Sequence, residues 1–564
     1  MKKINFISVF LLVLTMLIVF LSKANSQEVV NVEVNNIKIK SITPAHNFVG
    51  ANWVITSQGF KDIFSDTEKL DQFANAIKKS NIDTIRYPSG VNIMNFFWDI
   101  SPLETYKAMK KLDYVRNNSG IYNYFNSLGN SNNLDFFSFL EFCRKNGFKA
   151  TVQVNSFKVY DKDSNSIKII KPFKAFKQTN TNWDEGKVDW NLVRKAAMSA
   201  AEEVKWVKEN GYNDVVKYWE IGNEEYLKNS EAHAAYTGEE YGKIASLFVH
   251  EMKKADTSAK IIVTNMPVLQ NPDLAEKPVF INHSYFYKWT NAVLNNLKEE
   301  NNNLFAVSSH IYPLLSTKIT SIQSYKAKLL ENPHYDINKK YNFHKTVLNK
   351  YGFGNTFIFL NEFNSNNPDS IYSQNWISTF GNAKMILSCA NNPYCYHCDY
   401  HELLDGYDPN DDVYTNKGWG ILHYAKDMTS SFYLYPIANI ISLLNENIKG
   451  NILKTNVSNI KIDAAGSCDN GVIRVILSNM GQDRLVNLKL KGFNNIKYVR
   501  NESLGINIPE TFSIIKSGDS RSYPSEIGQI NTLDNAVKIN YSSGIYKINI
   551  PANTLSVFIF KKDI

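Results

Sequence analysis

The amino-acid sequence predicts an α/β protein, a (β/α)8 TIM barrel followed by a C-terminal all-β sandwich domain. Between residues 48 and 401, eight short apolar runs alternate with longer amphipathic stretches, which is the pattern of repeated βα units. After about residue 432 the pattern changes to short alternating runs separated by Asn, Gly and Ser, which is typical of a sandwich. A chain of 564 residues is long enough for one large barrel and one smaller domain.

Residues 1–26 have the composition of a secretory signal peptide. Lys2-Lys3 precede an apolar core from Phe6 to Leu21, and Ala24-Asn25-Ser26 supply small residues at the cleavage site. An uncleaved membrane anchor is the alternative, but an anchor needs roughly 20 apolar residues, and Ser8 and Thr15 interrupt this core. We therefore predict a secreted or periplasmic protein that has no membrane association once the signal peptide is cleaved.

The charge and composition argue against several classes of partner and cofactor. Removal of Lys2, Lys3 and Lys23 with the signal lowers the formal net charge from +8 to +5, which is too weak to indicate nucleic-acid binding. The nine Trp residues suit stacking against sugar rings and suit a large core equally well. No pattern indicates a nucleotide, flavin or haem site, so no cofactor is expected, and the sequence does not specify the oligomeric state.

The catalytic barrel is predicted over residues 45–430. Its eight candidate strands share a short, mostly apolar run bounded by polar residues: Phe48–Ile55, Thr84–Tyr87, Ala150–Asn155, Val216–Ile221, Lys260–Thr264, Ala306–His310, Phe357–Leu360 and Tyr394–His397. Three of the intervening helices are expected over Glu68–Lys79, Leu134–Lys145 and Val193–Asn210. The last two stop before glycine, as helices often do.

The sandwich is predicted over residues 431–564. Its candidate strands are Ile460–Ala464, Gly471–Asn479, Leu485–Leu490, Ile496–Val499, Ala536–Tyr541, Ile545–Ile550 and Leu555–Lys561. A further segment, residues 27–44, contains apolar side chains that alternate with polar ones from Val29 to Lys40. We expect this segment to join the sandwich as an edge strand, which would place the N-terminal end of the mature chain against the C-terminal domain.

Two glutamates, each preceded by an asparagine, follow buried strands of the predicted barrel. Glu224 comes after the fourth strand, and Glu362 comes after the seventh strand, 138 residues later (224 to 362). Because the C-terminal ends of all barrel strands meet at one face, the two carboxyl groups are expected there together. Paired carboxylates carry out retaining glycoside hydrolysis, and we expect Glu224 as the general acid and Glu362 as the nucleophile.

Three more residues are expected to support these two glutamates. Asn223 is placed to hydrogen-bond a sugar 2-hydroxyl, a contact that strengthens in the transition state. Arg86 lies in the second strand and Tyr312 follows the sixth, so both could point toward the barrel mouth and keep Glu362 ionised. A purely structural salt bridge is the alternative for Arg86.

Four residues are weaker candidates for substrate binding. Asn155 ends the third strand and could donate to a sugar hydroxyl or form a turn. His310 could bind substrate or fill the top layer of the barrel. Trp98 and Trp419 could stack on a sugar, although tryptophan is more often a core residue; Trp419 lies between two glycines after the eighth strand.

Taken together, these motifs resemble glycoside hydrolase clan A, and within the clan they are most similar to the family 51 α-L-arabinofuranosidases. The similarity rests on Trp-Glu-Ile-Gly-Asn-Glu at 219–224, Arg-Tyr-Pro-Ser-Gly at 86–90 followed by Trp98-Asp99, Ser-His-Ile-Tyr at 309–312 and Asn-Glu-Phe-Asn at 361–364. The resemblance covers roughly residues 45–430. It implies a carbohydrate substrate and a retaining double displacement, with Glu224 as acid/base and Glu362 as nucleophile.

Two departures from the family pattern leave the substrate open. Ser89 stands where a glycine is usual, and residues Pro393–Asp405 around the eighth strand do not follow the family. Families 39, 30 and 79 share the asparagine-glutamate signature, so a β-xylosidase, a glucuronidase or an endo-glycanase is an alternative. A transglycosidase would use the same covalent intermediate. A non-catalytic carbohydrate-binding protein is a further alternative, which the presence of both carboxylates disfavours.

Cys389, Cys395 and Cys398 lie close together in a chain with five cysteines. In an exported protein they permit one disulfide, and free apolar thiols are the alternative. Cys395 and Cys398 with His397 and His401 resemble a metal cluster, but the second paired half of a structural zinc site is missing, so no metal is expected. A metal-dependent hydrolase that rests on His397, Cys398 and His401 is kept as an alternative.

Overall fold

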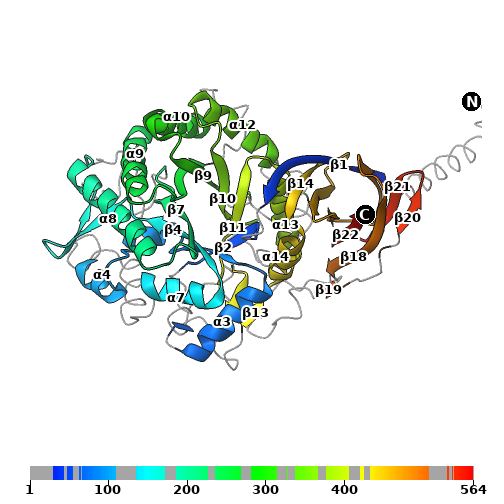
Figure 1. Ribbon diagram of the computed structural model, residues 1–564, viewed down its shortest axis with the longest axis horizontal. Coiled ribbons are helices and arrows are strands. Elements are labelled where there is room, and N and C mark those ends of the chain that lie inside the picture. Colours follow the sequence, from blue (N-terminus) through cyan, green and yellow to red (C-terminus); the bar gives the residue numbers. More distant parts are fainter. Residues whose placement is uncertain are drawn as a thin grey trace, which may run out of the picture.

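The computed structural model describes residues 29–42, 47–54, 63–64, 66–109, 135–171, 186–226, 236–267, 281–313, 327, 337–365, 376–404, 420–424, 432–506, 530–532, 537 and 539–562. Figure 1 shows a barrel surrounded by helices and, beside it, a curved sheet. The predicted signal peptide lies outside the described residues. Of the helices in the described ranges, none is long and apolar enough to traverse a bilayer.

Eight parallel strands close into a barrel, as the sequence predicts. In chain order they are β2 (Val49–Asn52), β3 (Thr84–Tyr87), β4 (Lys149–Val154), β7 (Val216–Ile221), β8 (Ile261–Pro267), β9 (Leu304–Ile311), β10 (Phe357–Phe363) and β11 (Cys395–Tyr400). Their order around the barrel follows the chain, and β11 pairs with β2 to close the ring. All eight predicted strands are confirmed, because runs of apolar residues suit strands that are buried on both faces.

Helices cover the outside of the barrel (Figure 1). In the described ranges they are α3 (Thr67–Lys79), α4 (Pro102–Met109), α7 (Phe136–Asn146), α8 (Trp190–Glu209), α9 (Gly238–Ala255), α10 (Ile281–Leu297), α12 (Ile337–Lys350), α13 (Trp376–Asn391) and α14 (Pro436–Asn447). The side chain of Asp66 caps the start of α3, and Thr237 with Glu240 forms a capping box at the start of α9. Helix α7 ends at Gly147 in the left-handed conformation, as the sequence predicts.

Short elements extend the loops of the barrel. They are the 3-10 turns η1 (Gly90–Asn95) and η4 (Lys298–Glu300), the hairpin of β5 (Lys158–Asp161) with β6 (Ser166–Ile169), and the hairpin of β12 (Leu422–Tyr424) with β13 (Phe432–Leu434). The η1 turn directly follows β3, so it lies at the same end of the barrel as the carboxyl ends of the strands.

The second domain is a ten-stranded sheet that folds over its own apolar core. Its strands, in spatial order, are β19 (Ile530–Thr532), β18 (Ile496–Ile506), β22 (Thr554–Lys562), β16 (Val472–Asn479), β15 (Ile462–Asp469), β14 (Gly450–Val457), β1 (Val29–Ile42), β17 (Arg484–Lys491), β21 (Ile545–Ile550) and β20 (Ile539–Ser542). Val34 of β1 and Phe558 of β22 belong to one core although their strands are not neighbours. The sheet therefore curves back on itself, and the predicted sandwich is confirmed.

The N-terminal strand β1 joins this sheet in its interior. It pairs antiparallel with β14 and parallel with β17. The prediction of an edge strand is therefore wrong. Val30, Val32 and Val34 are all buried in the sandwich core, because alternate side chains of a strand point to the same face.

Helix α14 lies beyond residue 430, where the sequence places the end of the barrel, yet it packs with the barrel. Its Ile437 and Ile440 belong to the same core as the barrel strands. The side chain of its Asn445 hydrogen-bonds both the N–H and the carbonyl of Val49 in β2. The barrel layer therefore continues to about residue 447, and β14 begins the sandwich.

All five cysteines are free thiols. Cys389, Cys395 and Cys398 are fully buried. The ammonium of Lys40 in β1 donates to the carbonyls of Cys389 and Cys395 at 2.7 and 2.6 Å. Of the two alternatives, the structure shows apolar buried thiols and no disulfide.

Candidate active site

Glu362 lies near the end of β10 and is almost fully buried. In the register between β10 and β9, Glu362 stands opposite His310. All residues of β10 after Phe357 are buried. A carboxylate is held at this depth only when hydrogen bonds and charges compensate its burial.

Glu224 is presented by a tight turn that follows β7. Gly222 has φ +75° and Glu224 has φ +52°, so two residues of the turn are left-handed. The N–H of Gly222 donates to the carbonyl of Val154 at 3.0 Å, and the amide of Gln153 donates to the carbonyl of Gly222 at 3.0 Å. The turn is therefore attached to the neighbouring strand β4, and it places Glu224 at the carboxyl end of the barrel.

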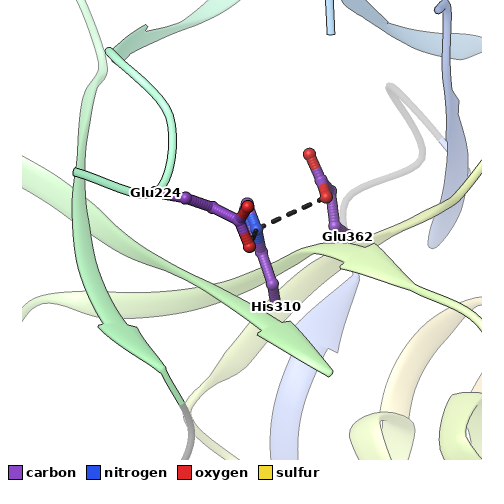
Figure 2. A group of neighbouring side chains, drawn as sticks. All are labelled: Glu224, His310 and Glu362. Atoms are coloured by element: carbon purple, nitrogen blue, oxygen red, sulfur yellow. Dashed lines mark hydrogen bonds and ion pairs between the residues drawn. The ribbon is translucent and has the colours of Figure 1, made fainter. Parts of the chain in front are cut away.

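His310 links the two glutamates. Its Nδ1 lies 2.8 Å from Oε1 of Glu224 and 3.4 Å from Oε2 of Glu362. Figure 2 shows the imidazole beside the carboxyl group of Glu224, with Glu362 facing both. One ligand atom from each of the three residues lies within 4.8 Å of the others. The two carboxyl groups that the sequence predicts to meet are thus close together.

Arg86 is fully buried and contacts four acceptors. Its Nε donates to Oε2 of Glu220 at 2.5 Å, and its Nη1 donates to Oε1 of Glu362 at 2.6 Å. The guanidinium also donates to the side-chain oxygens of Asn52 and Asn223, each at 2.9 Å. One guanidinium thus forms a buried ion pair with Glu220 and also contacts Glu362, so its ion pairing is not confined to a residue outside the predicted pair of glutamates.

Charges around Glu362 keep its pKa well below the usual range. Burial alone would raise this pKa, but the nearby charges of His310 and Arg86 outweigh burial. The hydroxyl of Tyr312 donates to Oε2 of Glu362 at 2.8 Å and acts in the same direction. Glu362 is therefore an ionised carboxylate at neutral pH.

The two glutamates in turn affect His310. Burial lowers the pKa of the imidazole, but the adjacent Glu362 and Glu224 carboxylates outweigh burial, and the net pKa is raised. Tyr226 also contacts Glu224, since its hydroxyl donates to Oε1 at 3.1 Å. Glu224 is thus hydrogen-bonded to two side chains, that of His310 in β9 and that of Tyr226, two residues further along the chain.

Two other predicted substrate-binding residues, Asn155 and Trp98, form hydrogen bonds with neighbouring parts of the barrel domain. Asn155 stabilises a turn, because its Oδ1 accepts from the N–H groups of Phe157 and Lys158, and its Nδ2 donates to the carbonyl of Phe96. Trp98 donates through Nε1 to Ser199 of α8 at 3.2 Å. Both residues line a cavity of about 20 Å³ whose lining does not include Glu224 or Glu362. Trp419 lies outside the described residues.

Several residues of the site were not singled out from the sequence. Asn52, at the end of β2, accepts from Arg86 and from the hydroxyl of Ser89, the latter at 2.8 Å, and its amide donates to the carbonyl of Asn361 at 2.9 Å. Ser89 is buried and has φ +68°, a conformation that explains why a glycine is usual at this position. Tyr226 and Asn52 could have been suspected only from their positions next to strand ends.

Glu224, His310 and Glu362 are also the one group in the described part of the chain whose atoms could hold a metal ion. An imidazole and two carboxylates suit several divalent cations. The contact between His310 and Glu224 accounts for their closeness without an ion. Cys395, Cys398 and the neighbouring histidines do not form such a group among the described residues.

The substitution Gly222→Ala is expected to destabilise the protein by about 2 to 4 kcal/mol. A Cβ atom here would lie 1.4 Å from Oε1 of Glu225, at a φ of +75°. Urea unfolding measures the effect. Gly147→Ala is the matched control, because its φ is +77° but nothing lies within 4 Å of its added Cβ. It should lose only about 1 to 2 kcal/mol. Equal losses in both variants would show that the contact with Glu225 is unimportant.

Comparison with known proteins places the fold among sugar-cleaving enzymes. No protein-family model and no curated protein matches the sequence. A family 51 α-L-arabinofuranosidase from Bifidobacterium longum matches in structure with a TM-score of 0.64 at 13% identity, covering 95% of this chain and 100% of the other. An α-L-arabinofuranosidase from Thermotoga maritima gives 0.59 at 14%, covering 94% and 99%. A family 30 subfamily 8 xylanase from Clostridium acetobutylicum gives 0.52 at 12%, covering 94% and 99%. At these identities the likeness establishes the fold.

Proposed function

We propose that this protein is a retaining glycoside hydrolase in which Glu362 is the nucleophile and Glu224 is the acid/base residue. The observation that carries the proposal is the close approach of these two carboxyl groups at the carboxyl ends of β7 and β10, within 4.8 Å. The fold that the chain shares with known glycosidases supports it.

The separation of the carboxyl groups favours retention of configuration. Retaining enzymes hold them about 5 to 5.5 Å apart, whereas inverting enzymes leave about 6.5 to 9.5 Å for a water molecule. One oxygen of Glu224 and one of Glu362 lie within 4.8 Å of each other, which supports the shorter separation of retaining enzymes. Direct attack by one carboxylate on the sugar is the mechanism that fits this spacing.

In the first step, the Glu362 carboxylate attacks the anomeric carbon while Glu224 donates a proton to the departing glycosidic oxygen. Arg86 and Tyr312 keep Glu362 ionised and fix its two oxygens in place. The products are a glycosyl ester on Glu362 and the free alcohol of the leaving group. Glu224 is then a carboxylate.

In the second step, Glu224 takes a proton from water, and the resulting hydroxide displaces Glu362 from the anomeric carbon. Asn223 is placed to assist both steps. Its Oδ1 is held by Arg86, and its buried Nδ2 has no hydrogen-bond partner among the described residues. A sugar hydroxyl would satisfy this donor. The buried amide without a partner therefore supports the proposed interaction with the 2-hydroxyl.

For the substrate, we propose an α-L-arabinofuranoside in a plant-type polysaccharide or oligosaccharide. The support is the sequence resemblance and the likeness to solved arabinofuranosidases. A β-xylosidase, a glucuronidase or an endo-glycanase is the alternative, since a xylanase and a glucanase-xylanase share the fold as well. A non-catalytic carbohydrate-binding protein is the alternative from another class.

We also propose that the protein is exported, on the strength of residues 1–26 alone. N-terminal sequencing of the protein recovered outside the cytoplasm should begin close after Ser26. A chain that keeps Met1 and remains in the membrane fraction would support the anchor instead.

A panel of aryl glycosides tests the activity and the role of Glu224 together. We expect the wild type to cleave one of α-L-arabinofuranoside, β-xyloside, β-glucoside and β-glucuronide. Glu224→Ala should lose about 10²- to 10⁴-fold on a substrate with a poor leaving group. The same variant should retain most of the first step on a 2,4-dinitrophenyl glycoside, which needs no acid.

The control for this panel is a set of polysaccharides. Cleavage of arabinan, xylan or glucan without cleavage of any aryl glycoside would favour an endo-acting enzyme. Binding without cleavage of either kind would contradict the hydrolase and favour the carbohydrate-binding alternative. An equal loss in the rate of the first step on both leaving groups in Glu224→Ala would contradict the role of Glu224 as acid.

A further inference from the structure

Glu225 is a third carboxyl group at the turn and has no part in the chemical steps described above. It is completely buried, unlike the partly exposed Glu224 that precedes it. Its Oε1 accepts from the backbone N–H of Asn223 and from the hydroxyl of Ser156, both at 2.9 Å. The side chain therefore folds back beneath the turn that carries Asn223 and Glu224.

The turn closes tightly over this carboxyl group. A Cβ atom at residue 222 would lie 1.4 Å from Oε1 of Glu225 and 2.4 Å from Oγ of Ser156. Ser156 follows β4, and the Gly222 N–H also bonds to the end of β4. Glu225 and Ser156 thus fasten the turn to an adjacent strand of the barrel.

The environment of Glu225 favours the neutral carboxylic acid. Titratable groups that interact with it include Glu220 of β7 and the tyrosines 226, 236 and 241, none of which carries a positive charge. Burial raises the pKa of Glu225 to about 8, against weaker opposing hydrogen bonds from Ser156 and Asn223. A buried anion would form only above that pH.

We propose that Glu225 is a positioning residue whose buried carboxyl group fixes the Gly222–Glu224 turn and thereby holds the Glu224 carboxyl beside His310. The inference rests on the proposed function, in which Glu224 is the acid/base. Its physical basis is that the Glu225 carboxyl group accepts from the Asn223 N–H inside the left-handed turn and from Ser156 outside it, so these contacts add to the bonds between Gly222 and β4 in fixing the shape of the turn.

The test compares two leaving groups in Glu225 variants. Loss of Glu225 should misplace the acid, so Glu225→Ala should lower kcat on a poor leaving group by about 100-fold, the effect of a misplacement near 1 Å. The rate of the first step on the matching 2,4-dinitrophenyl glycoside, measured as the burst of released dinitrophenol, should fall by less than about 5-fold, because that leaving group needs no protonation. Glu225→Gln keeps the acceptor for Asn223 and Ser156 and should restore most of the activity at pH 6.

The pH profile gives a second readout. Wild-type activity on the poor leaving group should fall as the pH rises through about 8, where Glu225 ionises. Since the folded state holds this proton to a higher pH than the unfolded state, the stability that the neutral acid contributes is present at low pH and declines as the pH rises toward 8. Glu225→Gln should lack both changes.

The matched control is Glu203→Ala. Glu203 is a second buried carboxyl group whose pKa burial raises, but it lies on α8, and its Oε1 has no hydrogen-bond partner among the described residues. It should leave the ratio of the two activities unchanged even if the protein loses stability. Ser156→Ala should change the ratio of the two activities in the same direction as Glu225→Ala, by a smaller factor. If Glu225→Ala does not fold, the result for Ser156→Ala decides the question.

Two results would overturn the inference. One is an equal loss on both leaving groups in Glu225→Ala and Ser156→Ala. The other is the same activity ratio in Glu203→Ala and Glu225→Ala. If the wild type cleaves no glycoside at all, the proposed function fails, and a crystal structure of Glu225→Ala then decides the positioning role: a displaced Glu224 supports it, and a Glu224 still 2.8 Å from His310 overturns it.

Discussion

Replacement of Glu362 by glutamine should lower kcat by about 10⁴-fold or more on every glycoside that the protein cleaves, because an amide cannot form the glycosyl ester. The substitution changes little else. The glutamine oxygen can still accept from Arg86 or Tyr312, whose donors lie 2.6 and 2.8 Å from the present carboxylate. The midpoint of thermal unfolding should therefore stay close to that of the wild type while the activity is lost. Measuring both quantities separates loss of the nucleophile from loss of the fold.

Azide distinguishes the nucleophile from the acid. In Glu362→Gly, azide can occupy the space of the missing carboxylate and attack the sugar directly, which should give a glycosyl azide of inverted configuration. In Glu224→Gly, the ester on Glu362 forms first and azide then displaces it, so the azide product should keep the original configuration. The reverse pattern of configurations would exchange the roles of the two glutamates. Inverted products from the wild type with water would contradict the retaining mechanism.

Mass spectrometry offers a direct view of the intermediate. Glu224→Ala incubated with a 2,4-dinitrophenyl glycoside should accumulate the glycosyl ester, because the first step needs no acid and the second lacks its base. A peptide that contains Glu362 should then carry the added sugar mass. The double variant Glu224→Ala, Glu362→Gln is the control and should show no such peptide.

The barrel could be predicted from the sequence because each of its strands is a short apolar run between helices with clear ends. Glu224, Glu362 and Arg86 could be predicted for a related reason: a polar residue at the end of such a run must lie at the carboxyl face of the barrel. The structure brings these three together with Asn223, His310 and Tyr312.

The sequence does not predict a residue's role where nothing in the neighbouring residues indicates its position in the fold. Strand β1 alternates as an edge strand would, and only its pairing with both β14 and β17 shows that it is interior. Asn155 ends a barrel strand like the residues of the site, and its hydrogen bonds hold the turn that was one of its two predicted roles. The polar contacts of Asn52 join it to three other strands, β3, β10 and β11, so no local pattern could reveal them.

Arg86→Met should destabilise the protein by about 3 to 5 kcal/mol, because it leaves two buried carboxylates without their cation. Glu220 is completely inaccessible, and the Glu362 side chain is 5% exposed. Unfolding in urea at pH 7 measures the loss. Adding Glu220→Gln to Arg86→Met removes one of the two uncompensated charges and should recover part of the stability.

Arg86→Lys is the matched control, because it keeps the positive charge and removes the planar guanidinium. An ammonium restores one positive charge, but a single point cannot reach acceptors on Glu220, Glu362, Asn52 and Asn223 as the guanidinium does. We expect stability between those of the wild type and Arg86→Met, and activity close to that of Arg86→Met. Full activity in the lysine variant would show that charge alone is needed.

The pH dependence of Arg86→Met follows from the pKa of Glu362. Burial raises this pKa, and the charges of His310 and Arg86 lower it below the unfolded value. A carboxyl group with a lowered pKa contributes stability at neutral pH that is lost as the pH falls through the folded pKa. Without Arg86 the pKa of Glu362 should rise, so activity should fall at a higher pH on the acid side than in the wild type.

The difference in stability between Arg86→Met and the wild type should be largest near neutral pH and should shrink on acidification, as protons replace the missing cation. A variant within about 1 kcal/mol of the wild type at pH 7, with an unchanged acid limb, would show that Arg86 neither compensates these carboxylates nor keeps Glu362 ionised.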